Sequence, residues 1–88
     1  MQMQFFAIRD NAVGAFLRPF VMQSVAQAVR SFGDEVNRQA DDNNMFHHPE
    51  DFELWLVGVF DDSQAPYIAG GSERRVAAAV DLKNPLSR

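Results

Sequence analysis

The sequence predicts an α+β domain in which a small sheet of about three strands is covered on one face by one long amphipathic helix. Three observations support this prediction: an aromatic strand near the N-terminus, a helical stripe of apolar residues over 22–37, and a nearly continuous apolar segment over 52–60. The expected order is strand, helix, strand, strand, short helix. With 88 residues, the chain is expected to form a single domain spanning 1–88.

The first strand is expected over residues 3–9, where aromatic and branched side chains precede the turn-forming pair Asp10-Asn11. Residues 13–20 contain a glycine and a proline, which disfavour a helix interior. This segment is therefore expected to be an apolar connector.

The clearest helical pattern spans residues 22–37. Apolar side chains recur there every three or four positions, which places them on one stripe of a helix. Ser24 and Gln27 have the spacing of a capping box, and Gly33 is expected to mark close packing against a neighbouring element. The stripe consists of Met22, Val25, Ala26, Val29, Phe32 and Val36.

The second half of the chain begins with a polar segment, 38–51, which is expected to be a long loop because it has no apolar periodicity. Residues 52–60 are expected to form the central strand, and residues 66–69 a third strand that returns along it. A short helix is expected over 73–82, capped by Ser72. One face of the central strand would hold Phe52, Leu54, Leu56, Gly58 and Phe60.

The net charge of −4 argues against a generic phosphate-binding protein, because non-specific affinity for nucleic acids comes mainly from lysine and arginine. The charge is uneven. Residues 1–33 carry three arginines against one aspartate, residues 34–62 one arginine against nine acids, and residues 63–88 four bases against two acids. A fold that brought the two ends together would show a basic face opposite an acidic one.

Several function classes are disfavoured by the residues present. There is no cysteine, so neither a disulfide nor a thiolate zinc site is expected. The apolar runs are far shorter than the roughly 20 residues of a membrane span, so no membrane association is expected. No nucleophile elbow or phosphate-binding glycine loop is present, and the protein is expected not to be an enzyme.

The segment His47-His48-Pro49-Glu50-Asp51 contains residue types that bind metals. Adjacent histidines beside a proline do not easily present both rings to one ion. The sequence favours a solvated acidic loop, and we expect no metal and no cofactor.

Four motifs follow one another between residues 4 and 68. They are Pro19-Phe20, Ala28-x-Arg30-x-Phe32-x-Asp34-x-Val36-Asn37, His48-Pro49-Glu50-Asp51-Phe52-x-Leu54 and Gly58-x-Phe60-Asp61-Asp62. In order and spacing they resemble the small nonstructural protein encoded by gokushoviruses, a branch of the Microviridae. The resemblance implies a bacteriophage protein of the host bacterial cytoplasm that binds single-stranded DNA and assists the switch to single-strand genome synthesis or viral genome packaging. It implies no catalytic residues.

The expected nucleic-acid-binding residues combine aromatic rings with arginines, because unpaired bases stack on exposed rings while basic side chains contact phosphates. Phe6 would add to this aromatic platform. Gly70-Gly71-Ser72, ahead of the paired arginines, would offer main-chain amides to a phosphate or simply separate strand from helix. The candidate residues are Arg9, Trp55, Tyr67, Arg74 and Arg75.

Two function classes stay open. One is the single-stranded DNA binder; the other is an acidic protein-interaction module that engages a viral replication or capsid protein without contacting DNA. The face that carries Trp55 would also suit a dimer interface, the role favoured for a small acidic protein. Because a small sheet with two apolar faces needs further cover, we expect a homodimer or higher homo-oligomer.

Overall fold

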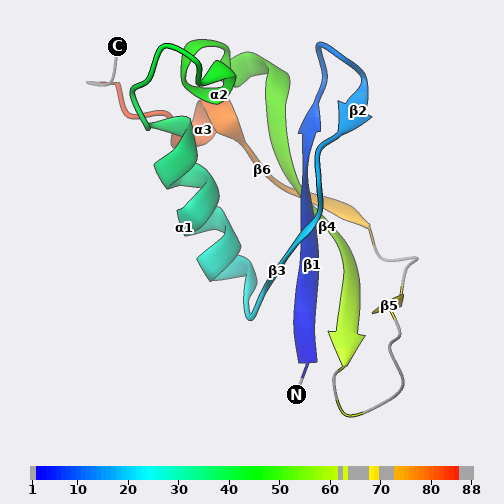
Figure 1. Cartoon of the computed structure of the whole chain (residues 1–88). Coiled ribbons are helices and arrows are strands. Elements are labelled where there is room, and N and C mark those ends of the chain that lie inside the picture. Colours follow the sequence, from blue (N-terminus) through cyan, green and yellow to red (C-terminus); the bar gives the residue numbers. More distant parts are fainter. Residues whose placement is uncertain (1, 62, 64–67, 70–72, 86–88) are drawn as a thin grey trace.

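The centre of the fold is a long antiparallel pair of strands, β1 (Gln2–Asp10) and β4 (Phe52–Asp61). Both lie side by side in Figure 1, a cartoon of the computed structural model. Their aromatic and branched residues suit a half-buried pleated sheet, so strands were predicted at both places. The structure describes residues 2–61, 63, 68, 69 and 73–85.

The free side of β1 is occupied by two short strands, β2 (Ala15–Phe16) and β3 (Phe20–Met22). The chain reaches β2 through a turn in which the Asp10 carboxylate accepts from the amide of Ala12 at 3.0 Å. Gly14 ends this turn with a φ of 78°, a conformation that favours glycine. The connector predicted for this segment is therefore wrong, because the turn folds it back into the sheet.

The free side of β4 pairs with β5 (Ile68–Ala69) and β6 (Arg74–Ala78). Within the described residues the sheet thus contains six antiparallel strands, and the prediction of about three is wrong. The helix predicted over 73–82 is also wrong, because only α3 (Ala79–Leu82) is helical. The Arg-Arg-Val-Ala-Ala segment has no strong strand propensity, but pairing with β4 overrides that preference.

The main helix, α1 (Val25–Val36), begins later than predicted. Ser24 is extended, and its Oγ accepts from the amide of Gln27 at 3.1 Å, which makes it the N-cap. Met22 lies in β3, where it pairs with Gln4. The helix has 12 residues, so a single long helix over the sheet is a second error of the predicted fold.

The polar segment after α1 is not the long loop predicted. It contains α2 (Asn44–His47) and a 3₁₀ turn, η1 (Pro49–Asp51). Asn43, only 4% exposed, holds this segment, since its Nδ2 donates to the carbonyls of Glu35 and Arg38 at 2.8 Å each. A buried asparagine organises the segment here, and apolar periodicity does not reveal it.

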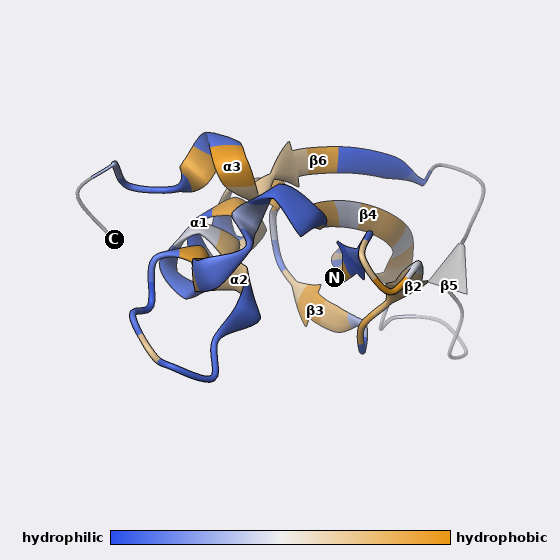
Figure 2. Cartoon of the chain, turned by 90° about the horizontal axis from the view of Figure 1, so that it is seen from above, coloured by the Kyte–Doolittle hydropathy of each residue, from blue (hydrophilic) through white to orange (hydrophobic). Residues whose placement is uncertain are grey.

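The helices gather on one side of the strands (Figure 2), where they cover one face of the sheet. Ala28 belongs to the buried stripe of α1, while Ala26, which was predicted there, is exposed. This stripe packs against the inward side chains of β1 and β4. The core consists of Phe6, Ala28, Phe32, Val36, Phe52, Leu54, Leu56 and Ala79.

A β-bulge interrupts the central pair of strands. The register shifts between Phe5 and Phe6, which leaves Val57 as an extra residue of β4. Such a residue reverses the alternation of side chains beyond it. Phe60 therefore lies on the face opposite the one predicted, and its ring meets Phe5 with the ring centroids 6.1 Å apart.

Candidate nucleic-acid interface

The face of the sheet opposite the helices carries the candidate site. Because side chains alternate along β4, Glu53 and Trp55 point away from the core. Strand register places Arg9 beside Glu53, Phe16 beside Arg9, and Arg75 beside Trp55. We call these five residues the outer face. Three of the five predicted binding residues, Arg9, Trp55 and Arg75, thus come together.

An aromatic pair forms one wall of the outer face. The rings of Phe16 and Trp55 meet edge to face, with centroids 5.8 Å apart and planes at 89°. The guanidinium carbon of Arg9 lies 5.0 Å from the centre of the Phe16 ring, within the range of a cation–π interaction. Ala7, the neighbour of Trp55 on β1, is only 4% exposed and contributes no ring. The aromatic platform of the outer face therefore consists of Trp55 and Phe16.

A hollow of about 480 Å³ opens between these side chains. Its volume falls within the range of about 300–1,000 Å³ that is usual for small-molecule sites. The surroundings combine aromatic and aliphatic surface with one guanidinium and two carboxylates. The lining residues are Arg9, Asn11, Phe16, Glu53, Trp55, Val57 and Glu73.

Glu53 is the central polar group of the hollow. Its Oε1 accepts from Nε1 of Trp55 and its Oε2 from Nη1 of Arg75, both at 3.2 Å. Partial burial raises the pKa of Glu53, but hydrogen bonds from Trp55, Asn11 and Arg75 outweigh it and hold the pKa below its ordinary value. Glu53 is therefore ionised at neutral pH, fixes the indole and offsets the charge of Arg75.

The two adjacent arginines do not form one basic cluster. Arg75 pairs with Trp55 on the outer face, whereas Arg74 pairs with Leu56, whose side chain faces the core. Successive residues of a strand point to opposite faces, so Arg74 lies away from the hollow. Of the two predicted arginines, the structure therefore brings only Arg75 to the outer face.

Phe6, which was predicted to add to the aromatic platform, does not join the outer face. Phe6 is fully buried and stacks on Phe20, with ring centroids 5.9 Å apart, so it belongs to the core. Tyr67 and the segment Gly70-Gly71-Ser72 lie outside the described residues.

Sequence reasoning missed Phe16, Asn11 and Glu53. The signal for Asn11 and Phe16 is the turn after β1, in which an aspartate is followed four positions later by glycine, and the signal for Glu53 is the alternation that places it on the same face as Trp55. A hairpin drawn through this turn returns Phe16 to the side of Arg9. Because this segment was predicted to be a connector, its pairing with β1 was not expected.

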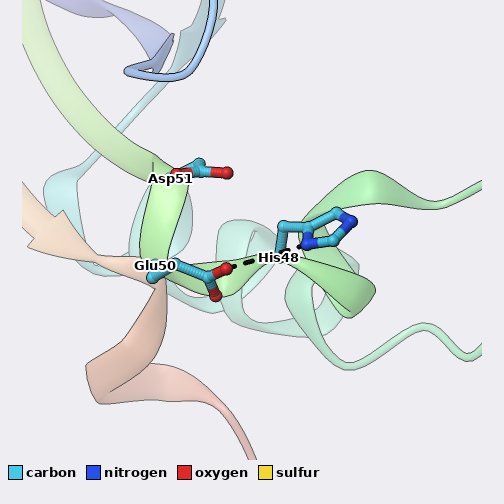
Figure 3. Close-up of side chains that lie close together, drawn as sticks. All are labelled: His48, Glu50 and Asp51. Carbon is cyan, nitrogen blue, oxygen red and sulfur yellow. Dashed lines mark ion pairs between the residues drawn. The ribbon is translucent and has the colours of Figure 1, made fainter.

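Three potential metal ligands meet at the start of β4. The ligand atoms of His48, Glu50 and Asp51 all lie within 4.8 Å of one another, and Figure 3 shows Glu50 extending towards His48. Nδ1 of His48 is 3.7 Å from Oε1 of Glu50. The side chains of His48 and Glu50 are mostly exposed, at 60% and 63%. Exposed acidic groups are common without a bound ion, so this cluster by itself supports no metal assignment.

The comparison with protein families places the chain among bacteriophage proteins. The chain belongs to the family described as Phage ORF5 protein, whose profile matches residues 3–82. No curated protein and no solved structure matches it. In the part of the chain that the structure describes, no helix is long and apolar enough to cross a membrane.

Proposed function

We propose that this phage protein is the small nonstructural protein of a gokushovirus-type microvirus. In this proposal it acts in the host bacterial cytoplasm, where it binds single-stranded DNA and assists the switch to single-strand genome synthesis or packaging. It acts by binding and catalyses no reaction. Membership of a phage family and the motif resemblance support the viral part of the proposal.

One observation supports DNA as the ligand: Trp55, Phe16 and Arg9 meet around a hollow on the sheet face opposite the core. Unpaired bases stack on exposed aromatic rings, and every base offers such a face. Duplex DNA hides its base faces. The protein should therefore prefer single strands to duplexes.

The electrostatic part of this binding should be small. Arg75 is already paired with Glu53, and the whole chain is acidic. About two to four phosphate contacts per subunit would give a logarithmic salt slope of roughly −1.5 to −3.

Fluorescence anisotropy with labelled single-stranded and duplex oligonucleotides at two salt concentrations tests the proposal. Trp55→Ala should weaken single-strand binding by about 1–3 kcal/mol and leave the salt slope nearly unchanged. Arg9→Gln should flatten the slope, whereas Arg30→Gln, an exposed position on α1, should not. Absence of single-strand binding at about 20 mM salt, where electrostatic contacts are strongest, would overturn the proposal.

The alternative is an acidic module that engages a viral replication or capsid protein without contacting DNA. The net charge of −4 favours it, and so do exposed apolar side chains, since Val13 is 75%, Leu17 42% and Val21 39% exposed. Isothermal titration against the purified replication and capsid proteins of the same phage tests this alternative. Heat of binding to either, together with no single-strand affinity, would favour it over DNA binding.

We also propose that the protein forms a homodimer or higher homo-oligomer. The exposed apolar side chains adjoin β2 and β3, which form one border of the sheet. The free side of an edge strand presents unpaired main-chain groups that accept a further strand.

A further inference from the structure

The hollow on the outer face presents hydrogen-bond acceptors beside its aromatic wall. Two carboxylates, those of Glu53 and Glu73, line it. The side chain of Glu53 is 21% exposed, so a ligand in the hollow can reach it. A carboxylate has about four lone-pair sites, and Trp55, Arg75 and Asn11 donate to this one. Glu53 can therefore accept a further hydrogen bond.

The carboxylates of the hollow disfavour the phosphates of DNA and favour base edges that donate hydrogen bonds. Glu53 and Glu73 both line the hollow, so a phosphodiester is disfavoured beside them and is expected on the side of Arg9. A base that stacks against the aromatic wall places its polar edge towards the carboxylate. An edge that donates hydrogen bonds is favoured there, and an edge made of carbonyl oxygens is repelled.

We propose that Glu53 makes the outer face selective among bases, with bases that carry an exocyclic amino group preferred to thymine. This inference rests on the proposed single-strand binding. Cytosine and thymine provide the sharpest comparison, because they have rings of one size. Cytosine offers an amino group where thymine offers a carbonyl oxygen, and carboxylates accept hydrogen bonds from that amino group.

The role of Glu53 has a readout that distinguishes selection from positioning. If Glu53 only held the indole of Trp55 in place, its replacement would weaken the binding of cytosine and thymine oligonucleotides equally. If it selects the base, its replacement changes the ratio of the two affinities. The amide of glutamine both donates and accepts, so Glu53→Gln retains an acceptor for the indole while removing the preference.

The test is fluorescence anisotropy with labelled oligo-dC and oligo-dT of equal length. The wild-type protein should bind oligo-dC roughly fivefold or more tightly than oligo-dT. Glu53→Gln should bring this ratio close to one. Glu50→Gln makes the same charge change at an exposed position outside the hollow and should keep the wild-type ratio. Trp55→Phe leaves Glu53 in place. It should weaken the binding of both oligonucleotides but keep the wild-type ratio of their affinities.

The outcomes separate the two proposals. Equal affinity of the wild-type protein for both oligonucleotides overturns base selection and leaves single-strand binding standing. An unchanged ratio in a folded Glu53→Gln variant overturns the role of Glu53. Failure of the wild-type protein to bind either oligonucleotide overturns the proposed function, and base selection with it.

Discussion

The side-chain amide of Asn43 donates a hydrogen bond of 2.8 Å to the main-chain carbonyl of Glu35, in the last turn of α1. The carbonyls at the end of a helix have no partner within the helix. Asn43 supplies a donor to a carbonyl at the end of α1. It is also the N-cap of α2, because its Oδ1 accepts a hydrogen bond from the amide of Met45. One buried side chain joins two helices.

The first prediction follows from this contact. Asn43→Ala should lower the free energy of unfolding by about 1–3 kcal/mol, because the carbonyls of Glu35 and Arg38 and the amide of Met45 lose their hydrogen bonds to this buried side chain. Urea denaturation followed by circular dichroism measures the change. Asn44→Ala, at an exposed neighbouring position, should change it by no more than about 0.5 kcal/mol. Equal losses in the two variants would contradict the role assigned to Asn43.

The second prediction concerns two glycines. Gly33 lies against Leu82 as expected of a packing position, but a Cβ built there would be 3.8 Å from Cδ1 of Leu82, an ordinary contact. Gly33→Ala should therefore stabilise the protein by about 0.5–1 kcal/mol, the helix-propensity difference.

Gly14→Ala provides the matched comparison for Gly33→Ala. A Cβ at Gly14 would meet no atom within 4 Å, but the φ of 78° strains any residue other than glycine. The variant should therefore be less stable than the wild-type protein by about 1 kcal/mol. Thermal unfolding ranks the two variants, and a destabilised Gly33→Ala protein would refute the packing described at α1.

The third prediction uses Trp55, the sole tryptophan of the chain, as a reporter of Glu53. The folded state lowers the pKa of Glu53 below its ordinary value of 4.5. The stability that ionised Glu53 contributes is therefore fully present above about pH 4.5 and is lost as the pH falls through the lower, folded-state pKa. Tryptophan emission should change over the same range.

Glu53→Gln should abolish this change in emission, because the amide does not titrate. Far-ultraviolet circular dichroism recorded in parallel identifies any acid unfolding of the whole domain. A Trp55 transition that persists unaltered in a folded Glu53→Gln protein would rule out Glu53 as its source.

The fourth prediction concerns self-association. At micromolar concentration, light scattering should give a mass of at least twice the 9.9 kDa of one chain. Replacing Leu17 and Val21 by glutamate should shift the protein towards the monomer, because both side chains are exposed at the border formed by β2 and β3. A wild-type protein of 9.9 kDa at high concentration would refute the oligomer.

Long periodic segments were predictable from the sequence, and short paired segments were not. The strands around Phe6 and Leu54 and the N-cap at Ser24 were found, because apolar alternation and capping chemistry are local. The short strands β2 and β3, with two and three residues, lack a periodicity of their own. They exist because β1 offers them hydrogen bonds, and a single sequence does not show which segment will take them.

The residues of the candidate site were likewise predictable only where a local pattern fixes them. Trp55 was identified because alternation along one strand fixes its face, and the structure brings it together with Arg9 and Arg75. Phe16 was missed because its place depends on the pairing of β2 with β1, and Glu53 because its hydrogen bond to Arg75 depends on the pairing of β4 with β6. Arg74 was grouped with Arg75 because the segment was predicted to be a helix, whereas in a strand two neighbouring side chains point to opposite faces.

The pairing of β1 with β4 also determines how the protein folds. About 40 residues separate the two strands, and closing a loop of that length costs entropy before any contact between them forms. Helix α1 and the pairing of β1 with β2 and β3 need only local contacts, but the core residues Phe52, Leu54 and Leu56 join them only when β4 arrives. Proteins governed by such distant contacts fold more slowly than helical bundles of equal size. During synthesis, the strand that contains Trp55 therefore leaves the ribosome after β1, β2, β3 and α1, and the long central pair of strands can form only then.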